Sequence, residues 1–395
     1  MNSLTPRADI VWGVEASPFL LKLEAMLRYC GRPFRRLPGE GRWLGNVLTA
    51  RRLEAAKRCG AVSRYPNMDQ SLDEYPSVPF FSEDGRQFQY DSTAIGYWLD
   101  EAATPEQSYM FPVELDVRFA AQLIDEAFDE FGLYMVHHNR WVRSATDTTM
   151  GERTAQEMSR LITPLLARGI RVNLPRRQVR RCPYLFSVAP QGYTADVEPQ
   201  RVPPARAGFP PTHDLLDESW RAYLAAMETI LAAQPFILGE RFTIADASAY
   251  GQLSMNLIDP STNAELHDRA PLTHQWLLDI RDGKHRASRG KLFASEALDP
   301  LLRIIMTTFA PLMDQNEKAW RIETQKGQKL FNERAFNRGQ ALYDGELNGH
   351  AFRSVVKTFQ VRVWNDLREN WRALPDAERV VLAKRLPGSE LFSQD

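Results

Sequence analysis

The first hundred residues alternate between strand and helix patterns, whereas everything after about residue 113 has the periodicity of helices alone. The expected elements of the first part are a strand at 9–14, a helix at 18–29, a strand at 32–37, a helix within 41–60, a hairpin at 80–90 and a helix at 92–102. Such an order, β-α-β-(α)-β-β-α, predicts a small α/β domain. The fold class is therefore α/β followed by all-α.

The second part has one long interruption. Residues 171–212 begin as the basic run "RVNLPRRQVRR" and continue as a Pro-rich segment, which predicts a long loop or insertion. Helical stretches are expected again near 294–322, 351–373 and 376–386. The sequence thus predicts one domain over 1–104 and an all-helical domain over 113–395, with an insertion at 171–212 and a C-terminal extension after about 290.

Composition narrows the class of protein. The chain has 395 residues, of which 44% are hydrophobic and 25% are charged, and this is typical of globular proteins. A net charge of -1 gives no reason to expect a nucleic acid or an anionic membrane as partner. The three cysteines, Cys30, Cys59 and Cys182, are far apart and indicate neither a disulfide framework nor a zinc site.

Two segments of the sequence bear on the cellular location of the protein. The N-terminus has no apolar segment of the signal-peptide kind. The apolar run "LLRIIMTTFAPLM" is interrupted by Arg303 and is too short to cross a bilayer. Together with the scattered cysteines, these features predict a cytoplasmic protein with no metal.

Three short segments have the residues of helix N-termini. Pro18 suits a first helical position and Ser17 suits the N-cap before it. Asp91 or Ser92 caps the helix that starts at "STAI". Thr243 and Asp246 have the spacing of a capping box. A helix N-terminus also attracts anions, so capping and anion binding both stay open for the first two segments.

Four segments in order resemble the glutathione S-transferase superfamily. These are "SPFLLKLEAML", "SVPFF", "QYDSTAIGYWLDE" and "FILGERFTIADASAYGQL". The resemblance covers residues 9–101 closely, is looser over 115–283 and fades beyond. It implies an N-terminal thioredoxin-like domain followed by a large helical glutathione-transferase-type C-terminal domain.

The resemblance also implies a glutathione site. The Val78-Pro79 bond would be cis, and the backbone of Val78 would pair with glutathione. Asp91 and Ser92 would bind its γ-glutamyl end. Ser17 occupies the position that meets the glutathione sulfur, where a related group of proteins has cysteine. A serine cannot form a mixed disulfide, so it favours activation of the thiolate for attack on an electrophilic small molecule.

Three functions follow from the resemblance. The first is a glutathione transferase that acts as a homodimer in the cytoplasm, with Ser17 as the catalytic residue. The second is a glutathione-dependent lyase or ether-cleaving enzyme, which needs the same thiolate. The third is a non-catalytic binding or assembly module on the same fold, which the large helical additions favour. Thr243 and Asp246 are assigned to folding rather than to the site.

Two further features have alternative interpretations. His137 and His138 are adjacent in a helix and so point in different directions, which disfavours a shared metal ion. Either one could line the substrate cleft. The arginines of the basic run indicate a solvated insertion, or else an anion-binding flap or partner patch.

Overall fold

The computed structural model describes residues 8–64, 72, 78–103, 109–194 and 202–394. Its first part is a four-stranded sheet of order β2-β1-β3-β4, with β1 parallel to β2 and antiparallel to β3, and β3 antiparallel to β4. The strands are β1 (Asp9–Gly13), β2 (Phe34–Pro38), β3 (Phe80–Ser82) and β4 (Gln89–Tyr90), and the helices are α1 (Pro18–Tyr29), α2 (Trp43–Arg58) and α3 (Ser92–Glu101). This order confirms the thioredoxin-like domain.

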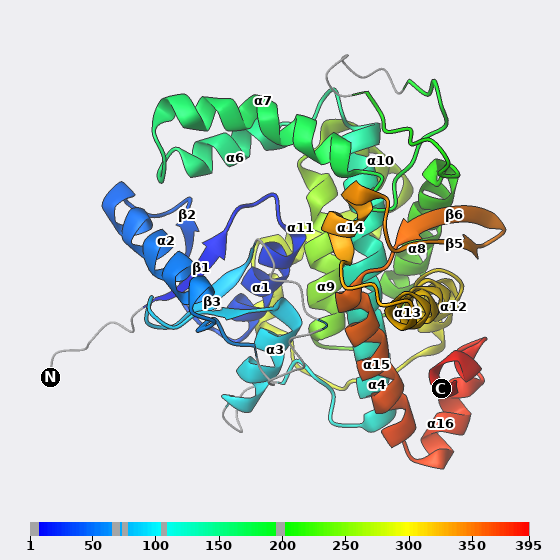
Figure 1. Cartoon of the computed structure of the whole chain (residues 1–395). Coiled ribbons are helices and arrows are strands. Elements are labelled where there is room, and N and C mark those ends of the chain that lie inside the picture. Colours follow the sequence, from blue (N-terminus) through cyan, green and yellow to red (C-terminus); the bar gives the residue numbers. More distant parts are fainter. Residues whose placement is uncertain (1–7, 65–71, 73–77, 104–108, 195–201, 395) are drawn as a thin grey trace, which may run out of the picture.

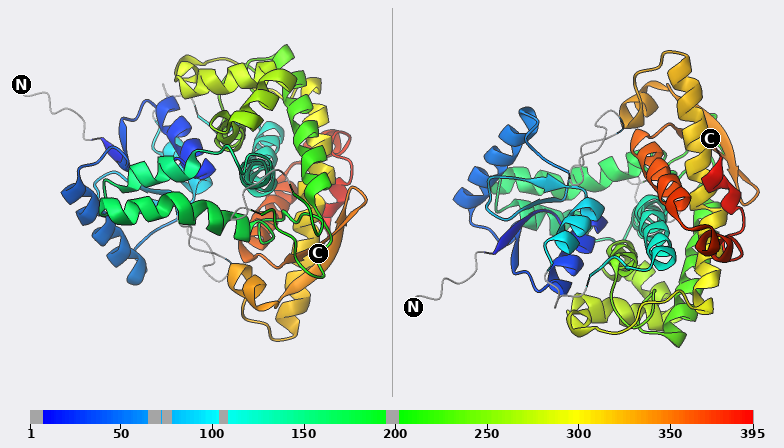
Figure 2. Two further views of the ribbon diagram at one scale, coloured as in Figure 1. Left: turned by 90° about the horizontal axis from the view of Figure 1, so that it is seen from above. Right: turned by 90° about the horizontal axis from the view of Figure 1, so that it is seen from below.

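The second part is mainly helical and lies beside the sheet domain (Figures 1 and 2). Its helices are α4 (Leu115–Ala127), α5 (Leu133–His138), α6 (Met150–Met158), α7 (Pro164–Arg181), α8 (His213–Ala233), α9 (Ile244–Leu253), α10 (Pro260–Arg269), α11 (Pro271–Arg281), α12 (Asp299–Thr307), α13 (Phe309–Gln325), α14 (Asn332–Arg338), α15 (Thr358–Ala373) and α16 (Asp376–Ala383). Two π-helical turns, Phe128–Gly132 and Asn139–Arg143, continue α4 and α5 as one helical rod. No helix within the described ranges is long and apolar enough to cross a membrane.

The two parts meet where α1 packs against α9. A Cβ atom on Gly251 would lie 2.7 Å from the carbonyl oxygen of Pro18 and 2.9 Å from Cβ of Lys22. Only glycine allows this approach of the two helices. The N-terminal turn of α1 is therefore fixed by the helical part as well as by the sheet.

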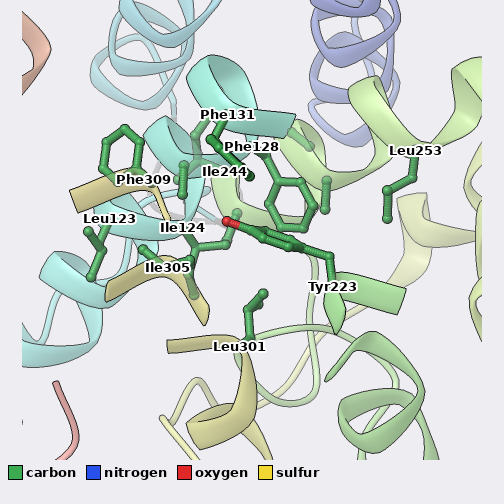
Figure 3. Close-up of a cluster of buried hydrophobic side chains, with 14 of the residues drawn as sticks. Leu123, Ile124, Phe128, Phe131, Tyr223, Ile244, Leu253, Leu301, Ile305 and Phe309 are labelled. Carbon is green, nitrogen blue, oxygen red and sulfur yellow. The ribbon is translucent and has the colours of Figure 1, made fainter. Parts of the chain in front are cut away.

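The largest hydrophobic cluster includes residues of the C-terminal extension. Figure 3 shows Leu301, Ile305 and Phe309 packed around the ring of Tyr223, together with side chains of α4 and α9. The hydroxyl groups of Tyr223 and Thr308 are 3.2 Å apart and hydrogen-bonded. Residues after 290 thus complete the core of the helical part, because these apolar side chains are removed from water.

The expected loop at 171–212 is wrong over its first eleven residues, which belong to α7. Pro175 lies inside this helix and is buried. A Cβ on Gly151 of α6 would lie 2.9 Å from Cγ of Pro175, so the glycine lets α6 and α7 pack closely. This packing compensates for the backbone hydrogen bond that a proline removes from a helix.

The expectation of an all-helical domain over 113–395 is also wrong in one place. β5 (Leu342–Leu347) and β6 (His350–Val355) form an antiparallel hairpin, and α15 begins at Thr358 instead of residue 351. Asn348 and Gly349 make the turn with φ of 48° and 78°. Two successive residues with positive φ are typical of the tight turn that Asn-Gly favours.

The predicted capping box is confirmed at the start of α9. The Asp246 carboxylate accepts hydrogen bonds from the backbone N–H groups of Thr243 (2.9 Å) and Ile237 (2.8 Å). We expect Asp246→Ala to lower the free energy of unfolding by about 1–3 kcal/mol, because buried N–H donors lose their acceptor. Urea denaturation measures this, with the exposed Asp268→Ala as control. An equal effect of the two substitutions would contradict the role of the box.

Candidate functional site

The candidate residues lie together at one end of the strands of the sheet. Trp12 of β1 pairs with Phe80 of β3, and Phe80 pairs with Tyr90 of β4. Ser17 follows the first of these strands, Val78-Pro79 precedes the second, and Asp91-Ser92 follows the third. Because β1 and β4 are both antiparallel to β3, the C-terminal ends of β1 and β4 lie beside the N-terminal end of β3. All three segments therefore leave the sheet at the same end of its strands. The fold brings together the residues that the sequence assigned to one site.

Ser17 caps α1 as predicted. Its hydroxyl oxygen accepts a hydrogen bond from the backbone N–H of Leu20 at 3.4 Å, and Pro18 occupies the first turn of the helix. The serine is 8% exposed. A hydroxyl at this position keeps its own hydrogen available as a donor, next to N–H groups that a helix leaves unpaired at its start.

The Val78-Pro79 peptide bond is cis, as expected. A Cβ on Gly13 would lie 3.5 Å from Cβ of Val78, so the end of β1 passes directly beside the residue before the proline. Val78 therefore borders the turn that leads from β1 to Ser17. The bond between Leu37 and Pro38, at the same end of the sheet, is also cis, which was not predicted from the sequence.

Asp91 is the N-cap of α3, and Ser92 is buried as its first residue. Oδ1 of Asp91 accepts a hydrogen bond from the backbone N–H of Ala94 at 3.2 Å. Oδ2 receives two guanidinium groups, Nε of Arg64 at 2.6 Å and Nη2 of Arg362 at 3.3 Å. The Nη1 atom of Arg64 is buried and has no hydrogen-bond partner among the described residues. Both oxygens of the carboxylate thus have partners, while one guanidinium nitrogen beside them has none.

Sequence reasoning missed both arginines. Arg362 lies on α15, in the C-terminal extension and 271 residues from Asp91. Figure 1 shows α15 beside α4, with its N-terminal half toward the sheet domain. No local motif marks such a contact, because a charge pair this distant in sequence depends on the packing of α15. The extension therefore forms one wall of the candidate site.

These arginines keep Asp91 ionised. Burial acts to raise the pKa of Asp91, but Arg64 and Arg362 outweigh burial and lower this pKa to about 2. A folded-state pKa below the ordinary value of 3.8 means that the ion pairs stabilise the fold above about pH 4. That contribution is lost as the pH falls through 2.

A cavity of about 60 Å³ lies next to Ser17. Ala16 and Pro18 line it from the start of α1, and Leu174 and Gln178 line it from α7. His137 also lines it, so one of the adjacent histidines faces this cavity. The basic helix that the sequence placed in a solvated loop therefore covers the cavity.

The two histidines face different partners, as expected. Nε2 of His137 is 3.3 Å from Oε1 of Gln178, whereas Nδ1 of His138 is 2.6 Å from the hydroxyl of Ser187. Burial lowers the pKa of His137 to about 3, so its ring is neutral at pH 7. In the described part of the chain, no group of three or more His, Cys, Asp or Glu side chains is arranged to bind a metal ion.

A buried ion cluster connects α1 and α3, the two helices whose N-termini belong to the candidate site. Nζ of Lys22 in α1 is 2.5 Å from Oδ1 of Asp125, 2.6 Å from Oδ2 of Asp129 and 2.7 Å from the hydroxyl of Thr93. Ser248 of α9 also donates a hydrogen bond to Asp125. Thr93 follows Ser92 in α3, so the cluster ties both helix N-termini of the site to α4.

Comparison with known proteins agrees with this architecture. Residues 210–255 match the family model described as "Glutathione S-transferase, C-terminal domain". No curated protein matches the chain. The match covers part of the helical region and agrees there with the resemblance drawn from the sequence.

Several solved structures are similar to the chain. One is the beta-etherase LigF from Sphingobium sp. strain SYK-6, with 15% identity over 74% of this chain and 97% of that chain and a TM-score of 0.40. Another is a glutathione S-transferase from Pseudomonas fluorescens, with 16% identity over 69% and 94% and a TM-score of 0.31. A glutathione S-transferase domain-containing protein from Marinobacter aquaeolei VT8 has 14% identity over 73% and 99% and a TM-score of 0.31.

Proposed function

We propose that the chain is a glutathione transferase that activates the glutathione thiolate at Ser17 for attack on an electrophilic small molecule. The observation that carries the proposal is the convergence of Ser17, Val78-Pro79 and Asp91-Ser92 at one end of the strands of the sheet. We also infer that the protein acts in the cytoplasm. The family-model match over residues 210–255 and the thioredoxin-like sheet support this function.

In this proposal each group has a separate task. The hydroxyl of Ser17 donates a hydrogen bond to the sulfur, and the N-terminus of α1 favours the thiolate over the thiol. The backbone of Val78 pairs with the extended peptide as an added strand does. Ser92 and the N-terminus of α3 bind the γ-glutamyl carboxylate.

The arginines refine the role expected for Asp91. Arg64 and Arg362 keep Asp91 ionised, so that it accepts hydrogen bonds from the ammonium group of the ligand. The unpartnered Nη1 of Arg64 is a donor that a ligand carboxylate would satisfy. The residues present therefore fit both charged groups at the γ-glutamyl end.

We expect Ser92→Ala to weaken glutathione binding by about 1.5–3 kcal/mol, the range for a lost hydrogen bond to a charged group. Asp91 rather than Ser92 caps α3, so thermal stability should change little. Isothermal titration calorimetry and thermal melting measure the two effects, and Thr229→Ala, which removes an exposed hydroxyl on α8, is the control. Unchanged glutathione affinity would leave Ser92 outside the site.

The proposal includes a homodimer, in which the sheet domain of one chain meets the helical part of the other. Within one chain, α15 and α16 already pack against α4, which restricts the surface left for a partner. Light scattering at micromolar concentration should give twice the chain mass of 45.2 kDa. A mass near 45.2 kDa would contradict the dimer.

A binding or assembly module is the second candidate function. The cavity beside Ser17 has a volume of about 60 Å³, whereas small-molecule sites are typically about 300–1,000 Å³. Retention on immobilised glutathione with elution by free glutathione separates the candidates. An enzyme, whether a transferase or the related lyase or ether-cleaving type, is retained, whereas a module that shares only the fold flows through.

A further inference from the structure

A second, larger cavity lies at the opposite end of α1. It has a volume of about 430 Å³ and is lined by Arg28, Tyr29, Arg32, Asp100, Arg286 and Arg289, among other residues. The twelve residues of α1 separate it from Ser17, a distance of about 18 Å along the helix axis. The cavity is therefore distinct from the proposed glutathione site.

This cavity sits at the junction of the two parts of the chain. Arg28, Tyr29 and Arg32 come from the end of α1 and the turn after it, whereas Arg286 and Arg289 come from the segment after α11. His285, beside Arg286, fixes that segment to α1 through a hydrogen-bonding contact of 3.0 Å between its Nε2 and the carbonyl oxygen of Ala25. Ligand sites occur preferentially at such junctions, and the volume falls within their usual range.

Two of the four arginines are already paired with carboxylates. Nη2 of Arg28 is 3.1 Å from Oε2 of Glu24. Nε of Arg32 is 2.8 Å from Oδ2 of Asp9, and its Nη2 is 2.6 Å from Oε1 of Glu83. These two arginines need no ligand to balance their charge.

The other two arginines have no carboxylate partner among the residues described. Nη1 of Arg289 donates hydrogen bonds to the carbonyl oxygens of Arg286 (3.1 Å) and Ser288 (2.6 Å), and within the described residues the Arg286 side chain makes no hydrogen bond or ion pair. Asp100 also lines the cavity, but among the described residues its carboxylate forms no ion pair with Arg286 or Arg289 and accepts the backbone N–H groups of Met110 and Phe111 instead. The described lining of the cavity thus holds four arginines and one carboxylate.

Tyr29 also lines the cavity. The residue is 6% exposed, and its buried hydroxyl has no hydrogen-bond partner among the described residues. The guanidinium of Arg289 lies 5.9 Å from the centre of the Tyr29 ring.

We propose that this cavity binds a small organic molecule with two or more oxyanion groups, such as a phosphate ester or a polycarboxylate. Guanidinium groups bind both kinds of oxyanion through paired hydrogen bonds, and Arg286 and Arg289 are the two that remain available.

The test uses isothermal titration calorimetry of the full chain with citrate and, separately, with inorganic pyrophosphate. We expect saturable binding of at least one anion, at least tenfold weaker in the Arg286→Gln/Arg289→Gln double variant. Both arginines are exposed, so the variant should keep the melting temperature of the unmodified protein. The control is Arg281→Gln, which removes an exposed arginine of α11 that pairs with Asp282.

Each outcome decides the proposal. Binding of pyrophosphate alone supports a phosphate ester as ligand, and binding of citrate alone supports a polycarboxylate. No saturable heat with either anion would overturn the proposal. Equal affinity in the double variant, or an equal loss in Arg281→Gln, would also overturn it, because binding would then not depend on the cavity.

Discussion

Replacing Ser17 with alanine is expected to lower turnover with an electrophile by about 10²–10³-fold, the usual effect of removing one preorganised donor to an anion. Free glutathione is mostly a thiol at neutral pH, since the reference pKa of cysteine is about 8.5. Loss of the hydroxyl removes the hydrogen bond that favours the thiolate. The ultraviolet absorbance of bound glutathione should therefore show the thiolate at higher pH in Ser17→Ala than in the unmodified protein.

Two variants separate this role from the helix cap. Ser17→Thr keeps a hydroxyl that caps α1 and should keep the thiolate titration close to that of the unmodified protein. Ser17→Cys should react with glutathione disulfide to form a mixed disulfide and release one glutathione thiolate, which mass spectrometry detects. Identical thiolate titrations in Ser17→Ala and the unmodified protein would show that Ser17 only caps its helix.

Replacing Lys22 with methionine is expected to lower the free energy of unfolding by about 3–5 kcal/mol, because it leaves Asp125 and Asp129 buried without a cation. Burial acts to lower the pKa of Lys22, but these two carboxylates outweigh it and raise that pKa, so the ammonium form is stabilised. The side chains of Lys22 and Asp125 are each only 1% exposed. Removing one partner of such a cluster costs more than the cluster contributes as a whole.

Urea denaturation at two pH values tests this prediction. The difference between Lys22→Met and the unmodified protein should become smaller toward acid pH, because protonation of the carboxylates removes the unpaired charges. The control is Lys326→Met, which removes an exposed lysine that pairs with Glu323 three residues away and should have little effect. A loss in Lys22→Met as small as in the control would contradict the structural role of the cluster.

The loss of Lys22 should also affect the site. Thr93 is bound by the same ammonium group and lies next to Ser92 in α3. Without Lys22, the N-termini of α1 and α3 lose a shared anchor. The same variant should therefore weaken glutathione binding, although Lys22 is buried behind the site.

Several features of the fold follow from short stretches of sequence. Ser17-Pro18, Asp91 and the pair Thr243 and Asp246 cap their helices in the positions that the sequence predicts. Each cap depends on residues within one helical turn, so neighbouring residues are sufficient to predict it. The cis bond before Pro79 required the family resemblance, since an isolated Val-Pro bond favours trans.

Two elements differ from the prediction: the hairpin of β5 and β6, and helix α7. Asn348-Gly349 is a strong hairpin signal, but helical spacing was assigned to the residues that follow it. Pro175 argues against a helix, yet α7 forms because Gly151 allows α6 to pack against that proline. Tertiary packing outweighs local propensity at this position.

The sequence by itself determined the order of elements in the sheet domain, the helix caps and the residues of the candidate site that lie at one end of the sheet. Only the tertiary structure decided that Arg362 meets Asp91, that α7 covers the cavity beside Ser17, and that Arg286 and Arg289 face the end of α1. Caps and turns are set by neighbours a few residues apart. Contacts between groups far apart in sequence exist only once burial of the apolar faces has fixed how the helices pack.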